Sequence, residues 1–493
     1  MLQRRLEQFQ RDNARVIARY HGPQGRDAQG ISLLLRRLLD LPREQRQQEW
    51  QLTFTRFASR HRGFKPTLRR YFARLVTWLE SVGEFGIATE LSNLCEIDQL
   101  LAATYVTAEY SVESAAFFNP SVVPHPSQGH LAPGELRFIM SFRATGEGHI
   151  SSVAFRTGVL NSDGHIRLDP VSPFISTPTV ETHRRYDKAL FARKLQELHS
   201  WNAYTELALG QLTDHFTRQD MEQTMAGLPA TLDGANRDNA IHAMRWLAEA
   251  NYTVTFDDDE DICEHVIFPV SSVEAHGIED ARFVRFVEDD GTATYYATYT
   301  AFSGHAAAIQ LIETADFRSF NICTLNGPGI RDKGMALFPR RINGDYVMLG
   351  RQDSRSITLS RSRDLHFWHE YQPILEPRES WELMKIGNCG SPIETPDGWI
   401  ILTHGVGPIR RYCIGAALLD LNDPSHVIGR LRAPLIEPLE SEREGYVPNV
   451  VYTCGAILHR DILLIPYAMS DTRSGIAVCN VHALLESLHR DGP

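Results

Sequence analysis

The segment Ala275–Phe283 reads Ala-His-Gly-Ile-Glu-Asp-Ala-Arg-Phe, and it places two carboxylates, Glu279 and Asp280, beside Arg282. An alternating run follows, then an Asp- and Gly-rich turn and a second β-rich run, Thr294–Tyr299. A turn of this kind between two such runs predicts a β-hairpin. The hairpin would place both carboxylates at the start of a strand, where they can line a cleft. The alternative is that they only pair with Arg282 at the surface.

Similar β units recur along the chain from about residue 105 to residue 480. Each unit has an apolar strand, a turn with Gly or Asp, and a strand that carries aromatic residues. Five units are recognisable, in segments 136–155, 282–299, 337–350, 392–403 and 455–467. The later units are roughly 50 to 60 residues apart, which is typical of propeller blades, four-stranded sheets packed around an axial cavity. The sequence therefore predicts a mainly β fold with the repeats of a propeller.

Two regions have helical periodicity instead. In residues 1–104, Leu6, Phe9, Val16 and Ile17 recur at roughly helical spacing, and leucine-rich stripes follow. Residues 184–251 are again periodic and predict a helical insertion between β units. We therefore expect four parts: an N-terminal helical region 1–104, a catalytic domain 105–480, its helical insertion 184–251, and a C-terminal tail 481–493. The helical additions carry no evident chemistry and predict subunit contacts in a homo-oligomer.

Composition and charge narrow the function classes. The formal net charge of −11 argues against a general binder of nucleic acid or of anionic membranes, because both need a positive surface. Seven widely spaced cysteines without a Cys-x-x-Cys pair predict free thiols, and the histidines lack metal-ligand spacing. The charged N-terminal segment does not resemble a signal peptide, and no apolar run is long enough to span a bilayer. The expected location is the cytoplasm.

Four basic residues stand at the ends of β runs or in a loop that enters one: Arg143, Arg156, Lys333 and His404. In a propeller, strand ends of different blades converge near the axis. Several cations that meet there would form an anion pocket, because arginine forks grip phosphate through two-point contacts. The alternative is that each residue is a separate surface charge.

Acidic residues at strand ends suggest sugar chemistry. Glycoside cleavage needs a carboxylic acid that protonates the departing oxygen and polar groups that fix the sugar hydroxyls. Asp280 is the candidate acid. Asp353, in Arg-Gln-Asp-Ser, can line a cleft or cap a turn, and Asp471, in Ser-Asp-Thr-Arg, is either a turn former or a hydroxyl ligand.

Several segments, in this order, resemble glycoside hydrolase family 130, the β-mannoside phosphorylases and their hydrolytic relatives. They are 119–121 (Asn-Pro-Ser), 277–282 (Gly-Ile-Glu-Asp-Ala-Arg), 296–301, 333–339, 381–393, 404–406, 415–420, 447–456 and 470–472. The resemblance implies a five-bladed β-propeller, which agrees with the five β units. It covers the region from about residue 117 to residue 480 without the helical insertion.

The resemblance also implies roles for single residues. Asp280 would be the proton donor, acting through a hydroxyl of the bound mannosyl unit. The phosphate-binding residues would be Arg143, Arg156, Lys333, His404 and Tyr412. Asn119 and Asp471 would hold the mannosyl unit, and Glu279, Arg282 and Asp353 complete the expected substrate site. No metal and no cofactor is implied, and inorganic phosphate is a co-substrate.

The implied reaction is an inverting, reversible phosphorolysis of β-1,2-linked or related mannooligosaccharides, which yields α-D-mannose 1-phosphate. Hydrolytic relatives lose much of the basic group, so the two arginines, Lys333 and His404 favour a phosphorylase, since a phosphate dianion beside a carboxylate needs compensating positive charge. A β-mannoside hydrolase and a non-catalytic carbohydrate-binding propeller are the alternatives. The expected partners are the oligosaccharide and phosphate, with neither nucleic acid nor membrane.

Overall fold

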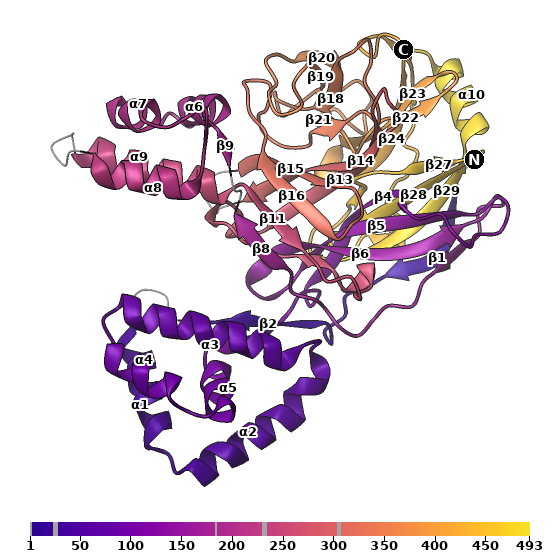
Figure 1. Cartoon of the computed structure of the whole chain (residues 1–493). Helices are drawn as coiled ribbons and strands as arrows, with labels where there is room; N and C mark the ends of the chain where they lie inside the picture. Colours follow the sequence, from indigo (N-terminus) through magenta and orange to yellow (C-terminus); the bar gives the residue numbers. More distant parts are fainter. Residues whose placement is uncertain (1, 23–27, 183–184, 229–233, 303–306) are drawn as a thin grey trace. The chain divides into compact units, whose positions relative to one another are not determined.

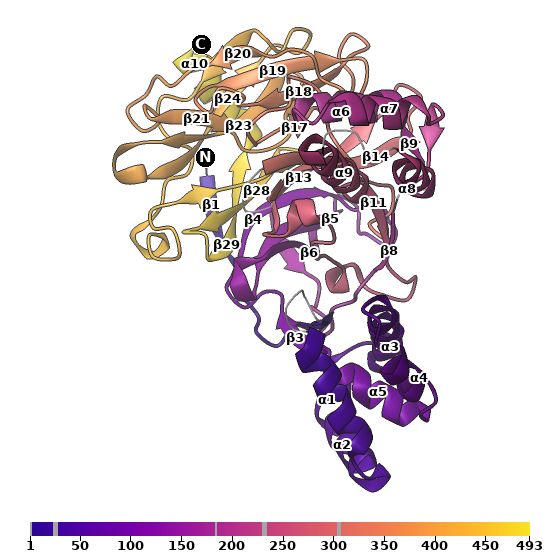
Figure 2. The same ribbon diagram turned by 90° about the vertical axis from the view of Figure 1, so that its left-hand side faces the viewer.

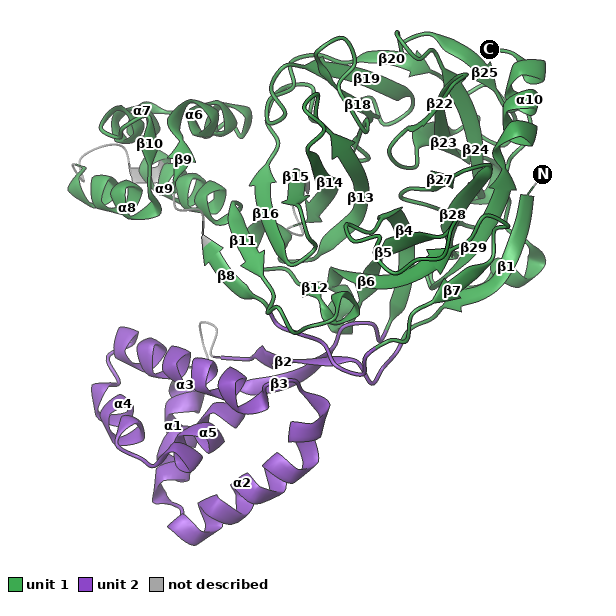
Figure 3. Cartoon of the chain, turned by 45° about the vertical axis from the view of Figure 1, so that its right-hand side comes forward, with its two compact units in different colours: residues 1–11, 115–171, 178–493 green, residues 12–114, 172–177 purple. Residues whose placement is uncertain are grey.

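The computed structural model describes residues 2–22, 28–182, 185–228, 234–302 and 307–493 (Figures 1 and 2). The chain divides into two compact units, coloured in Figure 3. The larger unit contains residues 1–11, 115–171 and 178–493, and the smaller one contains residues 12–114 and 172–177.

The smaller unit is helical, as its leucine periodicity predicts. Its helices are α1 (Ala28–Asp40), α2 (Arg43–Phe57), α3 (Phe64–Ser81), α4 (Phe85–Ser92) and α5 (Glu96–Thr104). They pack around a core that includes Leu35, Leu68, Leu75 and Leu91, all fully buried. Strand β2 (Val16–Tyr20) pairs with β3 (Thr107–Ser111), so residues just past the predicted boundary at 104 stay with the helices.

The helix predicted at the very start of the chain is wrong. Residues Leu2–Phe9 form strand β1, which pairs antiparallel with β29 (Arg473–Asn480) in the larger unit. Leu6, one of the apolar residues on which the helical prediction rests, is 97% exposed. The physical reason is tertiary: an edge strand with free backbone groups pairs with the N-terminal segment, and this pairing outweighs its weak helical periodicity.

The larger unit is mainly β, as predicted. Within the described residues it has five antiparallel sheets of four or more strands. The first contains β4 (Ala116–Pro124), β5 (Leu136–Thr145), β6 (Ser151–Leu160), β7 (Ile166–Leu168) and β12 (Val266–Ile267). The second contains β13 (Ile278–Val287), β14 (Ala293–Phe302), β15 (Ala307–Thr314), β16 (Ser319–Thr324), β11 (Tyr252–Thr255) and β8 (Thr179–Thr182).

The other three sheets come from the C-terminal half of the chain. The third contains β17 (Ala336–Leu337), β18 (Tyr346–Gly350), β19 (Ile357–Ser362) and β20 (Gln372–Leu375). The fourth contains β21 (Lys385–Asn388), β22 (Ile393–Thr395), β23 (Gly398–Val406), β24 (Tyr412–Leu419) and β25 (Val427–Arg430). The fifth contains β26 (Val451–Tyr452), β27 (Ile457–His459), β28 (Ile462–Met469), β29 and β1.

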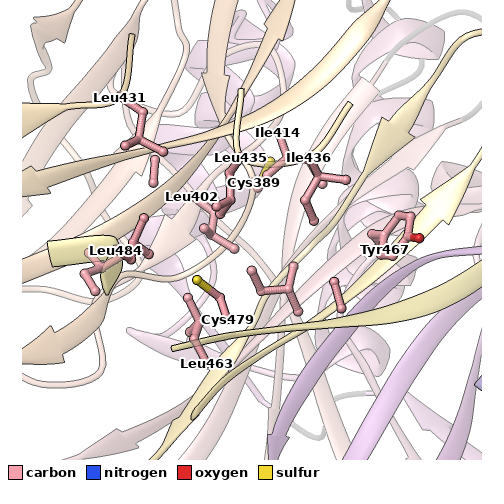
Figure 4. Packing of buried hydrophobic residues seen from close by; sticks show 14 of the residues in the cluster. Cys389, Leu402, Ile414, Leu431, Leu435, Ile436, Leu463, Tyr467, Cys479 and Leu484 are labelled. Carbon is pink, nitrogen blue, oxygen red and sulfur yellow. The ribbon is translucent and has the colours of Figure 1, made fainter. Parts of the chain in front are cut away.

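Buried side chains join each sheet to the next one. Between the fourth and fifth sheets, Leu402 and Ile414 meet Leu463 in the cluster of Figure 4. The other clusters that join neighbouring sheets pair Phe155 with Phe283, Phe286 with Met348, Val347 with Ile401, and Phe118 with Ala468. The last of these clusters links the first sheet to the fifth.

The helices expected within residues 184–251 are present. They are α6 (Lys188–Glu197), α7 (Ala203–Gly210), α8 (Arg218–Gly227) and α9 (Gly234–Glu249) (Figure 3). They share a core that includes Leu195, Met221 and Met244. A short ribbon of β9 (Tyr186–Asp187) and β10 (His215–Phe216) accompanies them.

The C-terminal segment is more ordered than the predicted tail. It forms helix α10 (Val481–Asp491). Asn480 is the N-cap of this helix, and its side chain accepts a hydrogen bond from the Ala483 N–H. Leu484 and Leu488 are fully buried in the cluster of the fourth and fifth sheets. Apolar residues at helical spacing therefore make this segment part of the core.

Two further observations concern the cysteines and membrane-spanning helices. All seven cysteines are free thiols, and six of them are buried. Among the described residues, no helix combines the length and the apolar character that crossing a membrane requires.

Candidate active site

Asp280 is displayed by a distortion of β13. The pairing of β13 with β14 shifts register between Glu279 and Arg282, and Asp280 itself has a φ of 55°. A bulge of this kind turns one side chain out of the regular alternation, and a positive φ is costly for a residue other than glycine. The hairpin predicted from the sequence is present, and its strained position is the candidate acid.

A second distortion lies in β4 of the neighbouring sheet. The register of β4 with β5 shifts between Phe118 and Ser121, and Asn119 has a φ of 49°. The Asn119 side-chain amide donates a hydrogen bond of 2.7 Å to Oδ1 of Asp280. Two bulges, about 160 residues apart in the sequence, therefore meet at one carboxylate.

Arg143 on β5 contacts both carboxylates. Its Nη2 lies 2.9 Å from Oε1 of Glu279, and its Nη1 lies 3.4 Å from Oδ1 of Asp280. Nζ of Lys333 lies 3.6 Å from Oε2 of Glu279. The alternative in which both carboxylates pair with Arg282 at the surface is wrong, because Arg282 is 3% exposed and its Nη2 donates to the hydroxyl of Tyr452 at 2.6 Å.

A second group of cations lies beside this carboxylate cluster. Arg351 donates from Nε to the Lys333 carbonyl at 3.1 Å, and its Nη1 lies 3.3 Å from Nε2 of His404. Gly334 has a φ of 92°, and a Cβ there would lie 3.0 Å from Nη1 of Arg282 and 3.1 Å from Nε of Arg351. Glycine is therefore the residue that lets the two guanidinium groups approach the same backbone.

His404 does not contribute a positive charge. It is completely buried, and burial, followed by the charges of Arg351, Arg282 and Lys385, holds its pKa well below the usual value. The ring is therefore neutral at pH 7 and can offer a hydrogen bond but no full charge. The ring of Tyr412 stacks on it with centroids 5.9 Å apart.

The structure does not bring two of the predicted residues to this cluster. Arg156 pairs with Met140, three residues from Arg143 on β5, so it lies on the opposite face of the sheet. Its guanidinium lies 4.5 Å from the ring centroid of Phe117, and its Nη1 donates to the Phe155 carbonyl.

Asp353 is the other displaced residue. Its Oδ1 accepts hydrogen bonds from the backbone N–H groups of Arg355 and Ser356 at 2.9 and 2.8 Å. Of the two interpretations left open by the sequence, the turn cap is the one that the structure shows.

Sequence reasoning missed three residues of the cluster, which are Arg351, Asn388 and Tyr452. Arg351 directly follows the apolar strand β18, as a basic residue at a strand end, so the criterion applied to the other cations could have found it. Asn388, whose side chain donates to the Gly334 carbonyl at 2.8 Å, and Tyr452 have no comparable signal. They reach the site because the fourth sheet, with Asn388, and the fifth sheet, with Tyr452, pack beside it.

The two aspartates of the site differ in charge. Burial would raise the pKa of Asp280, but Arg143, the Asn119 amide, Arg282 and Lys333 outweigh it and hold the pKa below the usual range. Burial, reinforced by the charge of Asp280, raises the pKa of Asp471 to about 6. Near neutral pH, Asp280 is therefore ionised, and Asp471 is the carboxyl that takes up a proton first on acidification.

This difference predicts how an Asp471→Asn variant depends on pH. The folded pKa of about 6 exceeds the ordinary aspartate pKa of 3.8, so the carboxylate destabilises the folded state above pH 6, and this penalty disappears towards pH 4. The substitution should raise the free energy of unfolding at pH 8 by up to about 3 kcal/mol and by much less at pH 4.5. Urea unfolding at both pH values measures it. The control is Asp461→Asn, which makes the same substitution at an exposed carboxylate that pairs with His482. An equal gain in the free energy of unfolding of Asp471→Asn at the two pH values would contradict the assignment.

Residues of both groups line one pocket. Its lining residues are Asp280, Arg282, Thr298, Tyr299, Thr300, Ile309, Lys333, Gly334, Met335 and Arg351. Three cationic side chains and one carboxylate thus border the same pocket. The lining offers donors of charge-assisted hydrogen bonds from three cations next to a carboxylate, an arrangement that suits a small dianion.

The residues that line the pocket lie within a region that matches a known family. The family model of glycoside hydrolase family 130, described as beta-1,4-mannooligosaccharide phosphorylase, matches residues 257–490. A 1,2-beta-oligomannan phosphorylase of Thermoanaerobacter sp. (strain X514) is 39% identical over 211 residues, which cover 42% of this chain and 69% of the relative. A beta-1,2-mannobiose phosphorylase of Listeria innocua is 34% identical over 232 residues, 45% of this chain and 62% of the relative.

Among solved structures, the beta-1,2-mannobiose complex of the beta-1,2-mannobiose phosphorylase from Listeria innocua aligns with 77% of this chain and 93% of its own, at 22% identity and a TM-score of 0.45. The family match contains Asp280, Arg282, Lys333, Arg351 and His404. Asn119 and Arg143, which contact Asp280 or Glu279 across the sheets, precede it.

Proposed function

Because this chain belongs to glycoside hydrolase family 130, we propose that it is an inverting β-mannoside phosphorylase. It would cleave β-1,2-linked or related mannooligosaccharides reversibly with inorganic phosphate and release α-D-mannose 1-phosphate. The observation that carries the proposal is the pocket in which Asp280 lies beside Arg282, Lys333 and Arg351. A hydrolase that activates water has no need for three cations around a small pocket.

In this reaction phosphate attacks the anomeric carbon while the bond to the glycosidic oxygen breaks. Arg282, Lys333 and Arg351 would hold the dianion and stabilise its charge in the transition state. Neutral His404 would orient it through a hydrogen bond, and Tyr412 would support the ring of His404. The departing oxygen needs a proton, and Asp280 would supply it through a hydroxyl of the mannosyl unit.

Asp280 is ionised in the free protein, so it has to gain a proton before it acts as an acid. Two of the cations that lower its pKa, Arg282 and Lys333, would also bind phosphate. Phosphate would offset their positive charge, and the pKa of Asp280 would rise on binding. Substrate binding and acid strength are therefore coupled through Arg282 and Lys333.

We also propose roles for the polar residues around the acid. Asn119 and Asp471 would hold the mannosyl unit, and Arg143 and Glu279 would fix the position of Asp280. The reaction needs no cofactor. We propose a cytoplasmic location, which the free cysteines support, and a homo-oligomer that forms through the helical additions.

For the fold, we propose that the five sheets are the blades of a five-bladed propeller. Each sheet packs on the next, and the first and fifth sheets share Phe118 and Ala468. The Cys454 N–H also donates to the Pro120 carbonyl at 2.7 Å, from the fifth sheet region to the first. Packing in a closed order of this kind supports a ring of blades around the pocket.

The test is an incubation of the purified protein with β-1,2-mannotriose, with and without inorganic phosphate. We expect mannose 1-phosphate in the tube with phosphate and no free mannose in the tube without it. Free mannose at equal rates in both tubes would contradict the proposal and indicate a hydrolase. Matched incubations with β-1,4-mannotriose establish the linkage.

A further inference from the structure

The loop between β16 and β17, residues 325–335, carries Lys333 and Gly334 into the pocket. Its far end is held by groups of the site itself. Arg351 donates to the Lys333 carbonyl at 3.1 Å, and Asn388 donates to the Gly334 carbonyl at 2.8 Å. These two hydrogen bonds anchor the end of the loop that carries Lys333.

The base of the loop is held by helix α6 of the helical insertion. Oε1 of Glu197 accepts a hydrogen bond from the Gly327 N–H at 2.6 Å. Nζ of Lys194 donates to the Leu325 carbonyl at 2.9 Å and to Oε2 of Glu197 at 3.0 Å. Lys194 is 8% exposed, so its amine is taken out of water in order to make these contacts.

On its other side, the base of the loop lies against the segment around Trp368. The Gly329 N–H donates to the Trp368 carbonyl, and the Trp368 N–H donates to the Asn326 carbonyl, both at 2.9 Å. Gly327 has a φ of 109°, and a Cβ there would lie 2.0 Å from the Trp368 carbonyl oxygen. The backbone is thus enclosed between α6 and this segment, with no room for a side chain at Gly327.

We propose that Glu197 and Lys194 are positioning residues for phosphate binding. By fixing Leu325 and Gly327, they hold the loop in the conformation that presents Lys333 to phosphate. The helical insertion, which has a core of its own, would then adjust the active site without contacting substrate. This inference rests on the proposed function, because it makes the affinity of the active site for phosphate depend on contacts from the insertion.

The first test measures phosphorolysis by Glu197→Ala as a function of phosphate concentration. A lost hydrogen bond to a charged group that holds a loop should raise the KM for phosphate on the order of tenfold, with kcat at saturating phosphate within about twofold. Glu197→Gln keeps an acceptor for the Gly327 N–H and should restore most of the affinity. The control is Glu222→Ala, which removes the same charge from an exposed pair with Arg245 in the same insertion. It should leave both constants unchanged.

The second test reads the loop directly and does not depend on activity. Hydrogen–deuterium exchange of the full-length protein should show faster exchange at residues 325–335 in Glu197→Ala, but not in Glu222→Ala. Lys194→Met, which keeps the apolar stem, provides the same test if Glu197→Ala does not fold. Unchanged exchange in this loop, or a loss of kcat at an unchanged KM for phosphate, would overturn the inference. Wild-type turnover without phosphate would instead contradict the proposed function, while the exchange result would still report on the loop.

Discussion

An Asp280→Asn variant should lose between two and four orders of magnitude in kcat with β-1,2-mannotriose, the range that general acids contribute. The amide has nearly the same shape as the carboxyl and can still accept a hydrogen bond from Asn119, but it cannot donate a proton to the departing oxygen. An activated aryl β-mannoside with a good leaving group needs no such proton. The loss with that substrate should therefore be much smaller, and the comparison of the two substrates measures the role of Asp280.

The matched control for this prediction lies in the same hairpin. Asp290→Asn makes the identical substitution in the exposed turn, where Asp290 accepts a hydrogen bond from the Thr292 N–H. It should leave kcat unchanged. If Asp280→Asn retains most of its activity while Asp471→Asn loses it, the acid is Asp471, whose pKa is raised to about 6.

The second large effect is expected for Lys333→Ala, in the KM for phosphate. The amine is one of three cations at the pocket, and it also lies 3.6 Å from Glu279. Without the amine, phosphate loses a charge-assisted contact. The negative charge of Glu279 is also less neutralised and repels phosphate more strongly. A contact of this kind contributes about 1.5 to 3 kcal/mol, so the KM should rise roughly ten- to a hundredfold while kcat at saturating phosphate falls less.

The side chain of Lys333 is 45% exposed, so its removal should leave the fold intact. Lys65→Ala, which removes an amine that faces the ring of Phe54, is the control for a lost lysine. Lys333→Arg should keep part of the affinity, because it preserves the charge with a different geometry. An unchanged KM for phosphate in Lys333→Ala would exclude Lys333 from the phosphate site.

Several parts of the site are predictable from local sequence patterns alone. The Asp- and Gly-rich turn predicted the hairpin of β13 and β14, and this hairpin carries Asp280 and Arg282. The sequence also predicts Lys333 in a loop that enters a strand and His404 at the end of a β run, which in the structure continues to Val406. These predictions succeed because turns and alternation are encoded over a few neighbouring residues.

Which of these side chains lie close together depends on how distant parts of the chain pack. Arg143 and Arg156 look equivalent in sequence, but the register of β5 and β6 puts them on opposite faces, because each step along a strand reverses the side chain. The sequence predicted His404 as a cation, but burial and neighbouring cations lower its pKa, so the ring is neutral. Arg351, next to it, carries the positive charge. Leu2–Phe9 became a strand because β29 offered an edge. Register, burial and edge pairing are set by residues far apart in the chain, so the local sequence could not fix them.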